Sequence, residues 1–141
     1  MSLIMTHAPS ADRSACRALV ALRIGVALLL IVHGIARASL GIVDDFGGFL
    51  DTLGFPFGVA LAWGITVFEI VVGLVLVSGR WVRPIALIFV VELAMGIALV
   101  HASEGWFVVG AGRNGMEYSV LLIAVLLAVA YAVPLPTQPN E

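Results

Sequence analysis

The sequence has few charged residues and no lysine. Charged residues make up 11% of its 141 positions, whereas a soluble domain has about 25%. All seven basic residues are arginines, and 62% of the residues are hydrophobic. This composition excludes an ordinary soluble domain and predicts an integral membrane protein in contact with the lipid bilayer.

Cysteine and clustered basic residues are also scarce. Cys16 is the single cysteine, so the chain cannot form an internal disulfide, and without a Cys-x-x-Cys motif it cannot carry out thiol exchange alone. The net charge is −2, and no run of basic residues occurs. These features argue against a nucleic-acid partner.

Four apolar segments are long enough to be membrane helices. They cover about residues 18–38, 58–78, 82–102 and 117–133, each near the roughly 20 residues that cross a hydrocarbon core about 30 Å thick. We therefore predict an all-α fold, an integral membrane antiparallel four-helix bundle over residues 18–133. A cytoplasmic tail (1–17) would precede it and a disordered tail (134–141) would follow it.

The arginines predict the orientation of these helices. Four of them lie in the first tail and in the second connection, and two lie on the opposite side. The first group is Arg13, Arg17, Arg80 and Arg83, and the second is Arg37 and Arg113. Because cytoplasmic loops are enriched in basic residues, we expect both termini in the cytoplasm and a multi-pass protein of the cell inner (plasma) membrane. The first connection, residues 40–57, would then lie outside, with apolar residues suited to the membrane interface.

Polar residues interrupt the apolar segments at several points. Two of them begin matching phrases, Glu69-Ile-Val-Val-Gly73-Leu-Val-Leu-Val77 and Glu92-Leu-Ala-Met-Gly96-Ile-Ala-Leu-Val100. An acid at the centre of a membrane helix costs roughly 2.5–3.5 kcal/mol. The candidates for a polar site are Arg23, His33, Arg37, Glu69, Glu92, His101 and Glu117.

Helical spacing predicts which faces these residues occupy. One stripe of small and polar residues runs along 58–78 and a similar one along 117–133. They consist of Gly58, Ala62, Thr66, Glu69 and Gly73, and of Glu117, Leu121, Ala124, Ala128 and Ala132. Small stripes allow close helix packing, so we expect both stripes and the glutamates to face the interior.

A rise of 1.5 Å per residue predicts two tiers of polar groups. The middle tier consists of Arg23, Glu69 and Glu92, with Arg23 as the cation for the glutamates. The outer tier consists of His33, Arg37, His101, Asn114 and Glu117. Nine helical residues place Glu92 and His101 on opposite sides, so His101 joins this tier only if its helix end unwinds or a neighbour wraps around it.

Several short motifs follow one another in a characteristic order. They are Arg23, His33-Gly34 with Arg37, Leu53-Gly54-Phe55-Pro56, Glu69 with Gly73, Gly79 with Arg83, Val100-His101 with Gly105-Trp106-Phe107, and Gly115-Met116-Glu117-Tyr118. In this order and spacing, the chain resembles the DoxX family of small four-helix membrane proteins over about residues 18–133. The resemblance implies a quinone-linked or respiratory redox protein.

The leading hypothesis is a membrane-embedded, quinone-associated accessory subunit of a respiratory or redox complex. A quinone headgroup needs a donor for each carbonyl and an acid or base for its protons, and the seven candidate residues could supply these. We expect quinone as the cofactor and no haem, flavin or metal, so electrons would come from other membrane or redox subunits.

Three other readings stay open. The polar residues could form a structural ion pair that fixes helix register in a structural or assembly subunit. Intramembrane carboxylates also mark proton relays, so a homo-oligomer could transport protons or a small solute. A metal or haem site made by His33 and His101 is disfavoured because their depths and faces agree poorly.

Overall fold

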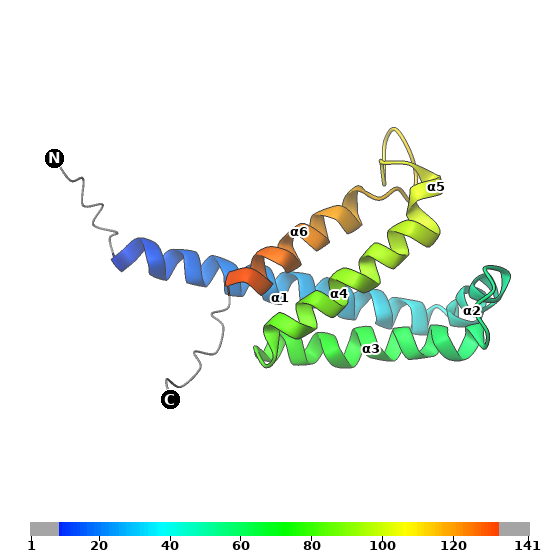
Figure 1. Cartoon of the computed structure of the whole chain (residues 1–141), viewed down its shortest axis with the longest axis horizontal. Helices are drawn as coiled ribbons and strands as arrows, with labels where there is room; N and C mark the ends of the chain where they lie inside the picture. The colour runs from blue at the N-terminus through cyan, green and yellow to red at the C-terminus, as the bar shows by residue number, and fades with distance from the viewer. Residues whose placement is uncertain (1–8, 133–141) are drawn as a thin grey trace, which may run out of the picture. The chain divides into compact units, whose positions relative to one another are not determined.

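A computed structural model describes residues 9–132, and these residues form helices and no strand. In chain order the helices are α1 (Pro9–Ser39), α2 (Val43–Thr52), α3 (Gly58–Ser78), α4 (Val82–Gly96), the π-helix η1 (Ile97–His101), α5 (Ala102–Glu104) and α6 (Glu117–Ala132). The all-α prediction is confirmed for this part of the chain. Figure 1 shows the helices in sequence colours.

Three helical stretches are long and apolar enough to cross a membrane. They are Arg13–Ser39, Gly58–Ser78 and Val82–Glu104. The fourth predicted segment is also an apolar helix, but α6 has 16 residues and is therefore about 24 Å long, shorter than a typical hydrocarbon core. The protein is thus a helical membrane protein with three helices of full membrane length among the described residues.

The predicted tails lie partly outside the described residues. The structure describes neither residues 1–8 nor the predicted tail 134–141. Helix α1 begins at Pro9, so residues 9–17, which we expected in a tail, are helical. Proline suits this first turn because it lacks only an N–H that would have no partner within the helix.

The chain divides into two compact units. Among the described residues, one contains residues 24–85, and the other contains residues 9–23 and 86–132. The first unit holds the second half of α1, all of α2 and α3, and the start of α4. The second holds the first half of α1 and the remainder of α4, with η1, α5 and α6.

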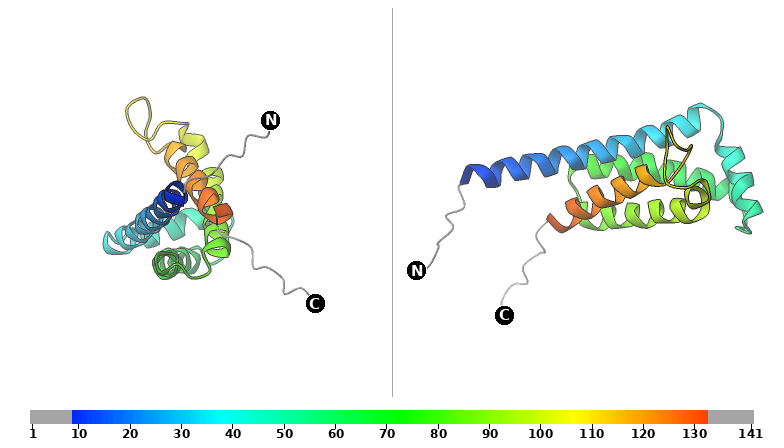
Figure 2. Two further views of the ribbon diagram at one scale, coloured as in Figure 1. Left: turned by 90° about the vertical axis from the view of Figure 1, so that its left-hand side faces the viewer. Right: turned by 90° about the horizontal axis from the view of Figure 1, so that it is seen from above.

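Within residues 24–85, α1 and α3 run side by side in opposite directions (Figures 1 and 2). A Cβ added at Gly34 would lie 3.0 Å from the Ile70 side chain, and one at Gly73 would lie 2.6 Å from that of Ile31. Gly34, which follows Ile31 in α1, therefore lies opposite Ile70, which precedes Gly73 in α3. This order shows that the two helices are antiparallel. The two glycines let the helix backbones approach closely.

The stripe predicted along α3 is the buried face of this helix. Its members Gly58, Ala62, Thr66, Glu69 and Gly73 are all buried. In a membrane helix the surrounding lipid is as apolar as the side chains, so small residues rather than large ones define the packed face. The stripe prediction is confirmed for α3.

The connection between α1 and α3 folds as the amphipathic helix α2. Its buried residues are Val43, Gly47 and Leu50, which recur at intervals of four and three. Val43 and Leu50 form a core cluster with Ala62 of α3, and Ala38 of α1 packs against it. Helix α2 thus joins the ends of α1 and α3 (Figure 1).

Two close contacts dock α2 against the start of α3. A Cβ at Gly47 would lie 2.5 Å from Val59 Cα, a distance that only glycine permits. The Gly58 N–H donates a hydrogen bond of 2.9 Å to Asp51 Oδ1. This carboxylate satisfies one of the open N–H groups of the first turn of α3 and suits the positive end of its dipole.

A tight turn joins α3 to α4, as the sequence predicts. Gly79 follows the last residue of α3 with φ 80°, a left-handed conformation, and its N–H donates to Leu76 O. Helix α4 then begins at Val82, which places Pro84 in its first turn. Glycine adopts the left-handed conformation that ends a helix without steric strain, and proline fits the first turn of the next helix.

In the second unit, α6 buries a different face from the one predicted. Its buried residues are Ser119, Leu122, Leu126, Val129 and Ala130. Leu121 is 60% exposed, and Ala124, Ala128 and Ala132 are exposed as well. The stripe prediction is wrong for α6, because its buried face is made mainly by larger residues, with Ser119 and Ala130 beside Leu122, Leu126 and Val129.

The two neighbouring glycines of α2 provide a matched test of the docking. Gly47→Ala should destabilise the protein by about 1–3 kcal/mol, because the methyl group meets backbone atoms that must move. Gly48→Ala meets no atom within 4 Å and should stabilise the helix by about 0.5–1 kcal/mol. Unfolding of the detergent-solubilised protein by SDS, followed by circular dichroism, measures both. Equal effects of the two substitutions would contradict the docked position of α2.

Candidate functional site

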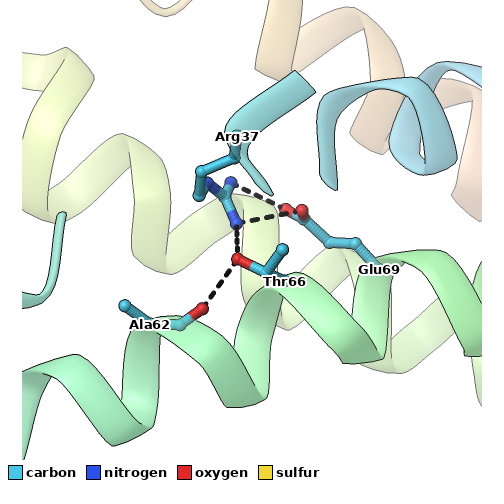
Figure 3. A network of polar contacts seen from close by, with 4 residues as sticks. All are labelled: Arg37, Ala62, Thr66 and Glu69. Atoms are coloured by element: carbon cyan, nitrogen blue, oxygen red, sulfur yellow. Dashed lines mark hydrogen bonds and ion pairs between the residues drawn. The ribbon is translucent and has the colours of Figure 1, made fainter. Parts of the chain in front are cut away.

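The centre of the candidate site is an ion pair between Arg37 of α1 and Glu69 of α3 (Figure 3). Arg37 Nη1 lies 3.0 Å from Glu69 Oε2, and Nη2 donates to Glu69 Oε1 at 3.1 Å. Two guanidinium nitrogens therefore face two carboxylate oxygens. The contact to Oε1 is a hydrogen bond between charged groups, which is stronger than one between neutral groups, whereas Oε2 accepts no hydrogen bond and is held by the nearby positive charge alone.

Thr66 extends the pair into a short hydrogen-bonded chain. Arg37 Nη1 donates to Thr66 Oγ1 at 3.1 Å, and Thr66 Oγ1 donates to Ala62 O at 2.7 Å. Because the hydroxyl hydrogen points to the Ala62 carbonyl, the oxygen lone pairs are left to accept from Arg37. Figure 3 shows all four residues.

The site is almost closed to solvent. The side chains of Arg37 and Glu69 are 11% and 6% exposed, and Thr66 is fully buried. An isolated charge in such surroundings would be very unfavourable. Each of the two charges is therefore stabilised by the opposite charge of the other.

Local helix geometry brings these groups together. Thr66 and Glu69 are three residues apart on α3 and hence share one face. Arg37 lies one turn after Gly34, whose missing side chain lets α1 approach α3: a Cβ there would lie 3.0 Å from Thr66 O and 3.1 Å from Glu69 Oε2. The stripe on α3 and the glycine on α1 together set the distance that the Arg37 side chain spans.

The predicted partner of Glu69 is wrong: the cation is Arg37, not Arg23. The prediction treated the outer ends of α1 and α3 as level. Because Gly34 lies opposite Thr66, Glu69 and Ile70, the end of α1 lies more than one turn inside the start of α3, a displacement of about 9 Å. Arg37 thus lies farther along α3 from its start than predicted, within reach of Glu69.

The other membrane candidates lie at different places. His33 is exposed on α1, one residue before the buried Gly34. Arg23 and Glu92 are half-buried, and both carboxylate oxygens of Glu92 are buried, in line with the predicted inward face. The structure joins Arg37 and Glu69 directly.

His101 and Glu117 both hold the loop between α5 and α6. His101 Nδ1 lies 2.8 Å from Asn114 O; since a carbonyl oxygen only accepts, Nδ1 carries the hydrogen. Glu117 Oε1 accepts from the Val108 N–H at 2.9 Å. The helix end before this loop widens into the π-helix Ile97–His101, which changes the direction of His101 relative to a regular α-helix.

The described part of the chain contains no cluster of potential metal ligands. Among residues 9–132, no three His, Cys, Asp or Glu side chains come close enough together to hold an ion.

Some residues of the site were not among the predicted candidates. From the sequence alone, Thr66 is assigned only to the packing stripe. Its hydroxyl lies one helical turn from Glu69, and this spacing indicates that it can bind the same partner. Phe46 of α2 lies with its ring centroid 5.0 Å from Arg37 Cζ, and nothing in the sequence separates it from the other apolar residues of the first connection.

Apolar helices of membrane length with a nearly buried ion pair define an integral membrane protein whose interior holds a polar site. A family comparison identifies it further: the DoxX family model matches residues 18–102, more than half of the chain. The chain belongs to the DoxX family. The matched region includes Arg37, Thr66 and Glu69 and ends before Glu117. Comparisons with curated proteins and with solved structures found no match.

The ion pair predicts a non-additive response to substitution. Arg37→Met or Glu69→Leu alone should destabilise the protein by about 3–5 kcal/mol, because each leaves the other charge buried without its partner. The double variant should lose much less than the sum. Thr66→Val, which removes one hydroxyl at constant shape, should cost about 1 kcal/mol.

Equilibrium unfolding of the detergent-solubilised variants measures the coupling between the two positions. Additive losses in the double variant would show that the two charges do not stabilise each other.

Proposed function

We propose that the protein is a membrane-embedded, quinone-associated accessory subunit of a respiratory or redox complex, with Arg37 and Glu69 at its ligand site. Membership of the DoxX family supports a role in a redox complex, because the resemblance to this family implies a quinone-linked or respiratory redox protein. The observation that carries the proposal is the state of the Arg37 guanidinium, which is held rigidly in apolar surroundings yet is not saturated.

The donors of Arg37 fit a quinone carbonyl. A guanidinium has five N–H groups. The hydrogen bonds to Thr66 and Glu69 use one hydrogen of Nη1 and one of Nη2, and Nη1 also lies 3.0 Å from Glu69 Oε2 as an ion pair. Among the described residues, Nε and the second hydrogen of Nη2 have no such acceptor. A charged donor in a dry site forms a strong hydrogen bond to a neutral carbonyl oxygen.

Glu69 fits the role of a proton-handling group beside that donor. A bound quinone would supply the two-electron chemistry, and a carboxylate near its oxygen can accept or return a proton. The candidate residues of this chain are acids, bases and hydrogen-bond donors, so we assign the supply of electrons to partner subunits. His33, in the same unit as the pair, remains a candidate for a further contact with the ligand. Arg23, Glu92, His101 and Glu117 remain candidate polar residues of the other unit.

We also propose the finer architecture that the sequence predicts. In this arrangement α6 is a fourth membrane helix, the four helices form an antiparallel bundle in the inner membrane, and both termini are cytoplasmic. Residues 40–57 would then lie on the outer side, which places the Arg37–Glu69 pair nearer that face.

A second candidate function is a purely structural or assembly subunit. The burial of the pair favours it, because two opposite charges that must meet in apolar surroundings fix the register of α1 against α3. Quinone binding separates the two candidates.

The test compares quinone binding by the wild type and by the double variant Arg37→Met/Glu69→Leu, which removes both groups without stranding a charge. Loss of a charged hydrogen bond should weaken binding of a short-chain ubiquinone analogue by roughly 10- to 100-fold. Arg80→Gln, at an exposed arginine of the same unit, is the control and should bind like the wild type. Unchanged binding in the double variant would remove Arg37 and Glu69 from the ligand site, and a wild type that binds no quinone would favour the structural candidate.

The orientation predicts which cysteine an impermeant maleimide reaches from outside intact cells. In a Cys16→Ser background, Asp45→Cys should react and Ser78→Cys should not, because the arginine distribution places the turn after α3 in the cytoplasm. Both positions are exposed, and Ser78→Cys avoids the left-handed Gly79. Labelling after the membrane is permeabilised controls for reactivity; the reverse pattern in intact cells would invert the topology.

A further inference from the structure

The ring of Phe46 lies over the guanidinium of Arg37. The distance from Arg37 Cζ to the ring centroid is 5.0 Å, within the range of a cation–π contact. Phe46 belongs to α2, whereas Glu69 and Thr66 belong to α3. The guanidinium is therefore held by two different helices in addition to its own.

These neighbours restrain different parts of the guanidinium. Glu69 and Thr66 accept hydrogen bonds along its edge, in or near its plane. An aromatic ring instead meets a cation with its electron-rich face. Contacts from both directions leave the planar group little freedom to rotate away from the carboxylate.

The position of Phe46 depends on the docking of α2. Its chain neighbour Gly47 touches the backbone of Val59 at the start of α3, and Phe46 itself packs against the cluster of Val43, Leu50 and Ala62. A displacement of α2 from α3 would therefore carry the ring away from Arg37.

We propose that Phe46 is a positioning residue for the Arg37–Glu69 pair. Its ring holds the guanidinium in the orientation that meets both carboxylate oxygens, and it closes the covered side of the pair to apolar molecules in the membrane. The effect on the pair is independent of any ligand. The consequence for a ligand rests on the proposed function: a quinone carbonyl would meet Arg37 along its remaining N–H edge rather than stack on the face that Phe46 occupies.

The reaction of Glu69 with dicyclohexylcarbodiimide measures this effect without a quinone. The reagent is apolar and modifies protonated carboxyl groups, so its rate reports both access to Glu69 and the strength of the Arg37 contact. Peptide mass spectrometry gives the initial rate at Glu69 for the full-length protein in lipid vesicles. Glu92, in the second unit and with buried oxygens, is the internal reference, and Arg37→Met is the positive control.

Phe46→Leu should react roughly three- to tenfold faster than the wild type, because it keeps an apolar side chain but loses the cation–π contact. Phe46→Tyr keeps the ring and should react like the wild type. Gly47→Ala should also react faster, since it displaces α2, whereas Gly48→Ala should not change the rate.

A wild-type rate in Phe46→Leu would overturn the proposal, as would equal acceleration by Phe46→Leu and Phe46→Tyr, because the ring would then have no special role. A double-mutant cycle with Phe46→Leu and Arg37→Met, measured by equilibrium unfolding, is a second test. Additive losses of stability would also overturn the proposal. The expected pattern together with no quinone binding by the wild type would support the role of Phe46 while rejecting the proposed function. The two proposals therefore fail separately.

Discussion

The arrangement of residues 24–85 depends on one constraint, that the charges of Arg37 and Glu69 must meet in apolar surroundings. Neither side chain can reach bulk water easily, since they are only 11% and 6% exposed, and an unpaired charge there would be very costly. The pair requires α1 and α3 to lie close together in one register. Gly34 and Gly73 supply the close approach, and Thr66 supplies the acceptor that keeps the guanidinium directed at the carboxylate.

Helix α2 completes this arrangement from a third direction. It is short and amphipathic, and a ten-residue helix of this kind has little stability by itself. Its order comes from contacts with its neighbours: Val43 and Leu50 pack against Ala62, Gly47 touches Val59, and Asp51 accepts from the first turn of α3. The same docking brings Phe46 over Arg37, so the packing of the connection and the electrostatics of the ion pair are linked.

Much of the fold could be predicted from the sequence. The α3 helix has the predicted ends, because a left-handed residue precedes it and Gly79 follows it, and its small stripe is buried as predicted. The face of α6 could not be found in the same way, because leucines and alanines are equally compatible with lipid and with helix contacts. The hydrophobicity of the side chains therefore gives little information about which face of a membrane helix packs against other helices.

The candidate site was predicted in its residue types but not in its pairing. Burial of Glu69 followed from its place on the stripe, whereas the choice of cation required the offset between α1 and α3. Helix α2 lies in the chain between the end of α1 and the start of α3. Depths calculated from the rise per residue and the ends of the apolar segments cannot include such an offset. Phe46 was missed for the same reason: its importance comes from a contact between helices, not from its own chemistry.

A buried ion pair is weak evidence for stability as such. Replacing both partners by apolar residues of similar volume is often neutral or stabilising in soluble proteins, although removing one partner is costly. In this chain an apolar pair would also escape the cost of placing an arginine and a glutamate in lipid. The pair is therefore better explained by what charges provide and apolar residues do not, namely a fixed register and directed donors. Thr66 and Glu69 accept hydrogen bonds from two N–H groups of Arg37. Under the proposed function, the remaining donors of this nearly buried guanidinium give the pair a role in chemistry as well as in packing.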